Sequence, residues 1–121
     1  MQIQREAPEN HSIRSYANKQ ITVGTTPYDT SVIVSKEKVI HPWNIHSIKD
    51  LSELLLEPIL ELKPDILIVG HEALGTQPPP VIIQYLSKHR IGFECMSIGA
   101  ASRTFNVLLS EDRLVVVGFI I

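Results

Sequence analysis

The sequence has 121 residues, of which 44% are hydrophobic and 20% are charged, and its 11 Lys and Arg against 13 Asp and Glu give a formal net charge of -2. This is the size and balance of one soluble globular domain that needs neither a metal nor a disulfide to fold. No basic run lines up along one face, so we expect no nucleic acid among its partners.

The cysteine content and the N-terminus favour a reducing compartment. Cys95 is the one cysteine, so it has no internal disulfide partner, and its apolar surroundings are typical of a buried free thiol. Residues 1–11 are polar and are expected to form a flexible tail before a single domain at 12–121. They lack the apolar core of a signal peptide, and no apolar stretch reaches the roughly 20 residues that span a bilayer. We expect a cytoplasmic protein without direct membrane insertion.

The first half of the chain is predicted to be a β meander. Residues 12–24 can form a hairpin that turns at Asn18 and Lys19, and residues 31–35 (SVIVS) are rich in β-branched side chains. The intervening TTPYDT supplies turn residues. Pro42 biases His41 away from helical angles, so a loop should follow the next short strand.

From Asp50 onward the hydrophobic period becomes that of helices. Asp50 is a plausible N-cap with Glu53 three residues on, and Pro58 should kink the helix or start a second one. Then follow a buried strand (PDILIVG, 64–70), a helix (78–89), a strand (GFECM, 92–96), a helix (99–110) and a strand (113–120). This β-α-β-α-β order over 65–121 predicts an α/β domain, with the front strands extending the sheet or packing beside it.

Several unusual motifs occur together in this chain: YDTSVIV, Pro42–Trp43, DILIVG followed by paired prolines, and IGFECM with AASRTFNVLLSEDR. In combination they resemble a small family of bacterial and archaeal proteins that includes a mitochondrial respiratory complex I assembly factor and an adipogenesis-associated protein. The resemblance covers residues 13–121. It implies a single three-layer α/β domain with a mixed central sheet. No reaction is established for the family as a whole, and the mitochondrial member's role implies a protein-binding function.

The resemblance also implies which positions matter. The positions that match the family's pattern are Tyr28, Trp43, Gly70, Glu94, Arg103, Thr104 and Asn106. The chain departs from the family at His71 and Glu72, because relatives commonly show Gly-Thr-Gly where this chain has Gly70-His71-Glu72. A ligand site that relatives share at this turn would therefore be altered here.

Two loops that leave parallel strands, GHEALGT and SIGAASRT, should lie side by side at the carboxyl edge of the sheet, where ligands of α/β proteins tend to bind. We call residues 70–72 and 97–103 the rim. A helix N-terminus offers free N–H groups there, and the guanidinium of Arg103 suits a carboxylate or phosphate. The candidate residues for binding a ligand or partner are Gly70, His71, Glu72, Ser97, Gly99, Ser102, Arg103 and Asn106. Their spacing is neither that of a P-loop nor that of GxGxxG.

Arg103 has a structural interpretation and a binding interpretation. It can pair with Glu94 on the preceding strand, or with Glu72 across the rim, and removal of one partner would then leave an uncompensated charge. It can instead share a polar helix face with Asn106 and Ser110 and contact a partner. The ion pair between Glu94 and Arg103 is the structural expectation.

No residue set forms a catalytic signature. His71 and Glu72 are adjacent, so their side chains point in different directions, and Cys95 is expected to be a buried thiol rather than a nucleophile. His41 and His46 are five residues apart, which suits a metal site poorly. We therefore expect no catalytic residue, no metal and no cofactor, although an enzymatic role stays open.

Two functional hypotheses remain. The first is a non-enzymatic protein-binding or assembly-factor-like domain that could aid assembly of a membrane-associated complex. The alternative is a small-molecule or anion-binding domain, or an enzyme, with a concave site at the rim. Trp43 and Tyr28 can be either core residues or anchors for a partner. Short edge strands could pair across a two-fold axis, which favours a homo-oligomer.

Overall fold

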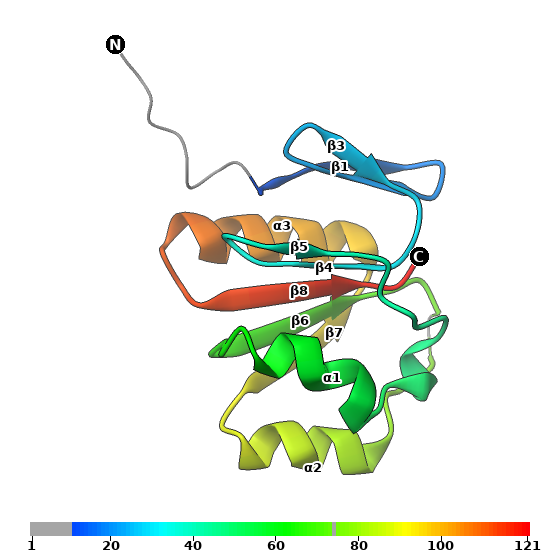
Figure 1. Ribbon diagram of the computed structural model, residues 1–121. Coiled ribbons are helices and arrows are strands. Elements are labelled where there is room, and N and C mark those ends of the chain that lie inside the picture. Colours follow the sequence, from blue (N-terminus) through cyan, green and yellow to red (C-terminus); the bar gives the residue numbers. More distant parts are fainter. Residues whose placement is uncertain (1–10, 74) are drawn as a thin grey trace.

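The computed structural model describes residues 11–73 and 75–121. Over these residues the chain forms two β-sheets and three α-helices (Figure 1). The expected N-terminal tail, 1–11, lies outside the described residues apart from His11, whose Nδ1 is 2.7 Å from the carbonyl oxygen of Ser35.

Five strands form the larger sheet, in the order β5-β4-β8-β6-β7. They are β4 (Val32–Val34), β5 (Val39–Ile40), β6 (Ile66–Gly70), β7 (Gly92–Met96) and β8 (Val115–Phe119). β6 pairs in parallel with both β7 and β8, whereas β4 pairs antiparallel with β5 and β8. The predicted mixed central sheet is confirmed, and β4 and β5 are front strands that extend it.

Helices cover this sheet on both faces. α1 (Glu53–Leu60) and α2 (Pro80–Lys88) pack on one face, and α3 (Ile98–Ser110) packs on the other. The chain runs from β6 through α2 to β7 and then returns through α3 to β8, on the far side of β6. The connection through α2 and the connection through α3 run in opposite directions across the sheet. Because both have the same hand, the two helices lie on opposite faces, which gives the layers seen in Figure 1. The predicted three-layer α/β class is confirmed.

The apolar run of β6 reflects this double coverage. Leu67 and Val69 pack in the core beneath α1 and α2, whereas Ile68 between them packs beneath α3. All three are fully buried. Because side chains alternate between the faces of a strand, a sheet covered on both faces requires apolar residues at consecutive positions.

A separate three-stranded sheet covers the outer side of α3. Its strands are β1 (Ile13–Ala17), β2 (Gln20–Val23) and β3 (Thr26–Tyr28), in that order. Asn18 and Lys19 have φ angles of 54° and 60°, as a two-residue type I′ hairpin requires, so the predicted turn is confirmed. Ile21 and Val23 pack with Phe105, which places α3 between the two sheets (Figure 1).

The predicted start of α1 was wrong by two residues. Ser52 caps this helix, because its Oγ accepts a hydrogen bond from the Leu55 N–H at 3.2 Å. Asp50 instead ends a short 3-10 helix, η2 (Ile48–Asp50). Pro58 lies inside α1 and does not begin a second helix.

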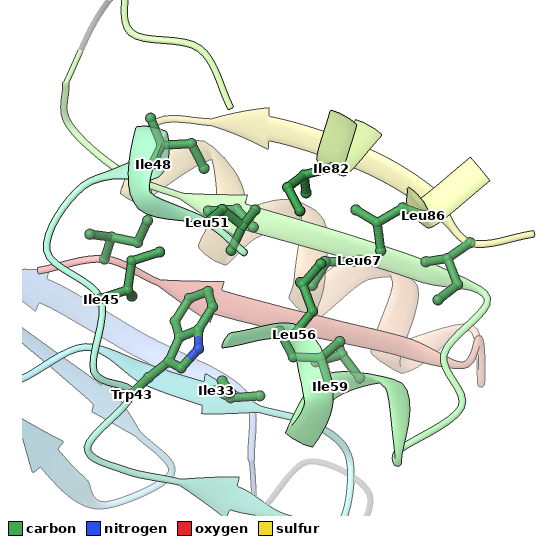
Figure 2. Packing of buried hydrophobic residues seen from close by; sticks show 14 residues of the cluster. Ile33, Trp43, Ile45, Ile48, Leu51, Leu56, Ile59, Leu67, Ile82 and Leu86 are labelled. Atoms are coloured by element: carbon green, nitrogen blue, oxygen red, sulfur yellow. The ribbon is translucent and has the colours of Figure 1, made fainter. Parts of the chain in front are cut away.

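Trp43 belongs to the core between the sheet and α1 (Figure 2). Its side chain is 4% exposed, and its Nε1–H donates to the carbonyl of Leu55 at 3.0 Å. The indole lies against Gly118 of β8, where a Cβ would be 2.5 Å from the ring. Core packing is therefore the interpretation that holds for Trp43. Tyr28 is half-buried, and its ring meets that of His41 edge-on at 4.7 Å between centroids.

Candidate functional site

The two halves of the rim lie side by side at the carboxyl ends of β6 and β7. Gly70 pairs with Met96, and the N–H of His71 donates to the Met96 carbonyl at 3.0 Å. From here β6 leads to α2 on one face of the sheet, whereas β7 leads to α3 on the other. The divergence of neighbouring loops is the arrangement that creates a ligand crevice in open α/β sheets.

Glu72 occupies the position that an external anion would take at this crevice. Its Oε2 accepts a hydrogen bond from the N–H of Ile98, the first residue of α3, at 3.0 Å. Ser97 caps the same helix, and its Oγ accepts from the Ala100 N–H at 3.2 Å. A carboxylate at a helix N-terminus contributes about 0.3–1 kcal/mol. The chain itself therefore uses two of the N–H groups that could have bound a ligand.

His71 is buried, and its ring bonds to the backbone of its own loop. Its Nδ1 accepts a hydrogen bond from the N–H of Ala73 at 3.2 Å. The carboxylate of Glu72 bonds to α3 instead. Within the described residues the two side chains form no pair that could act as a general base with an orienting carboxylate.

Gly70 allows β6 to pack closely against α3. A Cβ at this position would lie 2.8 Å from the Cβ of Ala101 and 3.3 Å from the Cα of Ile98. Both distances are too short for ordinary carbon contacts, so a side chain here would push α3 away from the sheet. The glycine serves packing, not the approach of a ligand.

Arg103 lines a hollow of about 280 Å³ between α3 and β1, together with Arg14, Gly99 and Ser102. The arginine is exposed, and its Nη1 lies 3.5 Å from where a Cβ of Gly99 would be. Gly99 thus leaves room for the guanidinium to lie back along its own helix. Ser102 is buried, and its Oγ donates to the carbonyl of Ile98 at 2.8 Å. Of these residues, the two arginines are the charged groups that face outward.

Asn106 fastens β1 to α3. Its Oδ1 accepts from the N–H of Ile13 at 2.8 Å, and its Nδ2 donates to the carbonyl of the same residue at 2.9 Å. Both polar atoms of the side chain are used in this way, so Asn106 serves the fold. The β1–β2 register shifts between Ile13 and Ser15, around Arg14. No signal in the sequence predicts this irregularity or the position of Arg14 beside Arg103. Arg14 was therefore missing from the expected site residues.

The expected ion pair between Glu94 and Arg103 is not present among the residues that the structure describes. Both side chains are exposed. Glu94 lines a different hollow with Thr104 and Leu108, whereas Arg103 faces β1. The two charges lie along different sides of α3, which is why they do not meet. Glu72, the other partner considered for Arg103, bonds to the helix backbone instead.

Cys95 lies on β7, where a buried thiol was expected; the residue is half-buried and packs against the core. Burial, with a smaller contribution from the charge of Glu94, raises the pKa of the thiol from 9.0 to about 11. A thiol that stays protonated at neutral pH is a poor nucleophile. The setting of Cys95 therefore gives no support to covalent catalysis.

Residues 11–73 and 75–121 contain neither a clustered metal site nor a membrane-spanning helix. No cluster of three or more His, Cys, Asp or Glu side chains there is placed to hold a metal ion. His41 and His46 are both exposed, and His41 packs against Tyr28. None of the helices in these ranges has both the length and the apolar character needed to cross a bilayer.

Known proteins resemble this chain in sequence and in fold. NADH dehydrogenase [ubiquinone] 1 alpha subcomplex assembly factor 3 of Drosophila melanogaster is 40% identical over 80 residues, which are 60% of this chain and 39% of that protein. Its namesake in Danio rerio is 30% identical over 115 residues, which are 93% of this chain and 65% of that protein. The chain thus spans less than two thirds of the length of either assembly factor.

The fold also matches a solved structure. An NMR structure from Xanthomonas campestris has a TM-score of 0.83 at 25% identity, and the match covers 97% of this chain and 89% of that one. A family description matches residues 13–120, almost the same span over which the motifs carry their resemblance. The chain therefore belongs to the family described as "Protein of unknown function (DUF498/DUF598)", which confirms the resemblance drawn from its motifs.

Proposed function

We propose that the chain is a non-enzymatic protein-binding domain that aids assembly of a membrane-associated complex in the cytoplasm, and that it contacts its partner through the surface around Arg103. Two relatives that carry the name of an assembly factor support the general role. The surface is proposed on the geometry of the rim and of the hollow beside it.

The observation that carries the proposal is the internal use of polar groups at the rim. Glu72 and Ser97 bond to the start of α3, and Asn106 bonds to the backbone of β1. A small-molecule site needs convergent polar groups that are free to fix the orientation of its ligand. Here those groups are engaged, which argues against the alternative of an enclosed ligand site.

Arg14 and Arg103 remain available in the hollow between β1 and α3. Both are exposed, and neither has an ion-pair partner among the described residues. Arginine is enriched in protein interfaces, because its planar fork binds carboxylates in a bidentate way and its apolar stem covers hydrophobic surface. We infer that the partner presents a carboxylate to these two side chains.

The test is a comparison of two charge reversals in affinity capture from the native organism. Arg103→Glu should abolish capture of the partner, since loss of an interface hot spot weakens binding by roughly thirtyfold or more. Arg113→Glu is the matched control, because Arg113 is also exposed but lines a hollow at the other end of α3. The same proteins recovered with both variants would refute the proposed surface. A metabolite that copurifies in stoichiometric amount, seen by native mass spectrometry, would refute the proposed function.

A further inference from the structure

β7 forms one edge of the five-stranded sheet and is paired on one side (Figure 1). The N–H of Gly92 and the carbonyl of Met96 both bond toward β6 and the residues that flank it. In a parallel pair, the N–H and carbonyl of one residue point to the same side, and alternate residues point to opposite sides. The N–H and carbonyl groups of Phe93 and Cys95 therefore point away from the sheet, where no described strand pairs with them.

An open hollow of about 420 Å³ lies beside this edge, on the face that α3 covers incompletely. Its lining is mostly apolar and includes Ile66, Ile68, Met96 and Leu108. Glu94 is the one charged residue in that lining. It lies at the middle of β7, is exposed, and has no ion-pair partner among the described residues.

We propose that the outer edge of β7 binds an extended segment of a partner protein by strand addition. The segment places apolar side chains in the hollow beside α3 and a lysine or arginine opposite Glu94. The backbone groups of Phe93 and Cys95 provide two donors and two acceptors for the added strand. Main-chain hydrogen bonds supply affinity in this mode of recognition, and alternate side chains supply specificity.

The charge of Glu94 favours a basic segment of a partner over a second copy of this chain as the strand added to β7. Full-length antiparallel pairing of β7 with β7 of another copy places Glu94 opposite Glu94, since this residue is central in Gly92–Met96. Like charges directly opposite each other on paired strands are destabilising, whereas opposite charges contribute roughly 0.2–1 kcal/mol. The same carboxylate therefore disfavours self-pairing and favours a basic segment.

The inference rests on the proposed protein-binding function for its choice of a polypeptide, but it uses a surface separate from Arg103. The edge strand and its hollow lie beside Thr104 and Leu108, whereas Arg103 lines the hollow against β1. A partner could engage either surface without the other, so each can be tested alone.

The direct test is NMR titration of the folded chain with two synthetic peptides, acetyl-Thr-Leu-Thr-Lys-Thr-Leu-Thr-amide and the same peptide with a central Glu. We expect the lysine peptide to shift the amide signals of Phe93 and Cys95, and to bind about two- to fivefold more tightly than the glutamate peptide. Absence of these shifts at millimolar peptide, or equal affinity for both peptides, would overturn the proposal.

Two variants locate the effect. Glu94→Lys should reverse the preference between the peptides, whereas Glu57→Lys, an exposed position on α1, should leave it unchanged. Cys95→Pro removes an N–H that points outward, and proline is tolerated on edge strands when the lost N–H faces solvent. This variant should keep the amide spectrum of the remaining domain but lose the peptide-induced shifts. An unchanged preference in Glu94→Lys, or unchanged shifts in Cys95→Pro, would contradict strand addition.

The affinity capture described for Arg103→Glu also separates this inference from the proposed function, when it is repeated with the two β7 variants. If the partner binds Glu94→Lys and Cys95→Pro as it binds the unaltered chain, the edge of β7 is not its docking site and the protein-binding function stands. If no specific partner is captured although the peptides bind at β7, the edge site stands without the assembly function.

Discussion

The rim and the outer edge of β7 are neighbouring regions with opposite hydrogen-bonding states. At the rim, Glu72 and Ser97 have polar side chains that suggested a ligand site, yet both bond to backbone groups of α3. At the edge, Phe93 and Cys95 have side chains that suggested nothing but packing, yet their backbone groups face outward. Whether a polar group already has a partner decides its availability for binding, and residue type does not.

The largest effect that we expect concerns the thiol at the edge. The backbone N–H and carbonyl of Cys95 point away from the sheet, but burial raises the pKa of its thiol to about 11. At pH 8 the thiolate fraction is then about a hundredfold lower than for a thiol with the ordinary pKa of 9.0. A thiolate of higher pKa is more nucleophilic, which offsets part of this factor, so alkylation by iodoacetamide at pH 8 should be about tenfold slower than that of glutathione or slower still. The rate should increase as the pH rises toward 11. A rate close to that of glutathione would mean that the thiol of Cys95 is exposed to solvent, as well as the backbone of β7.

The next effect tests how strongly the side chain of Asn106 holds β1 on α3. Asn106→Ala removes both hydrogen bonds to Ile13 and leaves buried backbone groups unsatisfied. We expect a loss of about 2 kcal/mol in unfolding free energy, and a fall in melting temperature of roughly 8 °C. Ser110→Ala is the control on the exposed part of the same helix, and it should stay within about 0.5 kcal/mol. Equal melting of the two variants would show that water replaces the lost bonds.

A smaller effect tests the charge at the rim. Glu72→Gln keeps an oxygen that can accept from Ile98 but loses the carboxylate charge at the start of α3. The expected loss is about 0.3–1 kcal/mol at low ionic strength, and salt should reduce it. Glu111→Gln, at the other end of the same helix, should be neutral or slightly stabilising in urea melts. A loss of the same size for both would assign the effect to net charge instead of the helix terminus.

The smallest expected effect concerns Arg103. Because it forms no ion pair with Glu94 among the described residues, Arg103→Ala should change the unfolding free energy by less than about 0.5 kcal/mol. The double variant with Glu94→Gln should be additive within about 0.5 kcal/mol. Thermal melts of the two single variants and the double variant measure this. A coupling above that value would restore the ion pair that the sequence suggested.

Most elements of the fold could be predicted because each has its own period and boundary residues. The exception is β3 (Thr26–Tyr28), which forms a strand where Pro27 and its neighbours were expected to form a turn. The assignment of strands to sheets could not, since β1 to β5 are short and their sequences do not specify which strand they pair with. The start of α1 was misplaced because Asp50 and Ser52 are both good N-caps, and tertiary packing of the intervening Leu51, which is 2% exposed, decides between them.

The position of the candidate site was predictable from strand order, but its contacts were not. The rule that loops meet at the carboxyl ends of parallel strands placed Glu72 near Ser97 correctly. The bonds from Asn106 to Ile13 join residues far apart in the sequence, and no local pattern encodes them. The open backbone of β7 also had no sequence signal, because edge position follows from the order of all five strands.

Because β8 is the central strand of the sheet, β4 cannot complete its packing until β8 has been synthesised. Val34 pairs with Val117, and Trp43 rests on Gly118, so the early part of the chain completes its packing against residues that the ribosome makes much later. Until β8 emerges, the side chains of β4, which are fully buried in the finished fold, have no surface to cover them. Pairing over such separations is slow and leaves strand edges exposed in the meantime. The nascent chain is therefore most vulnerable to aggregation until β8 has emerged and covers β4.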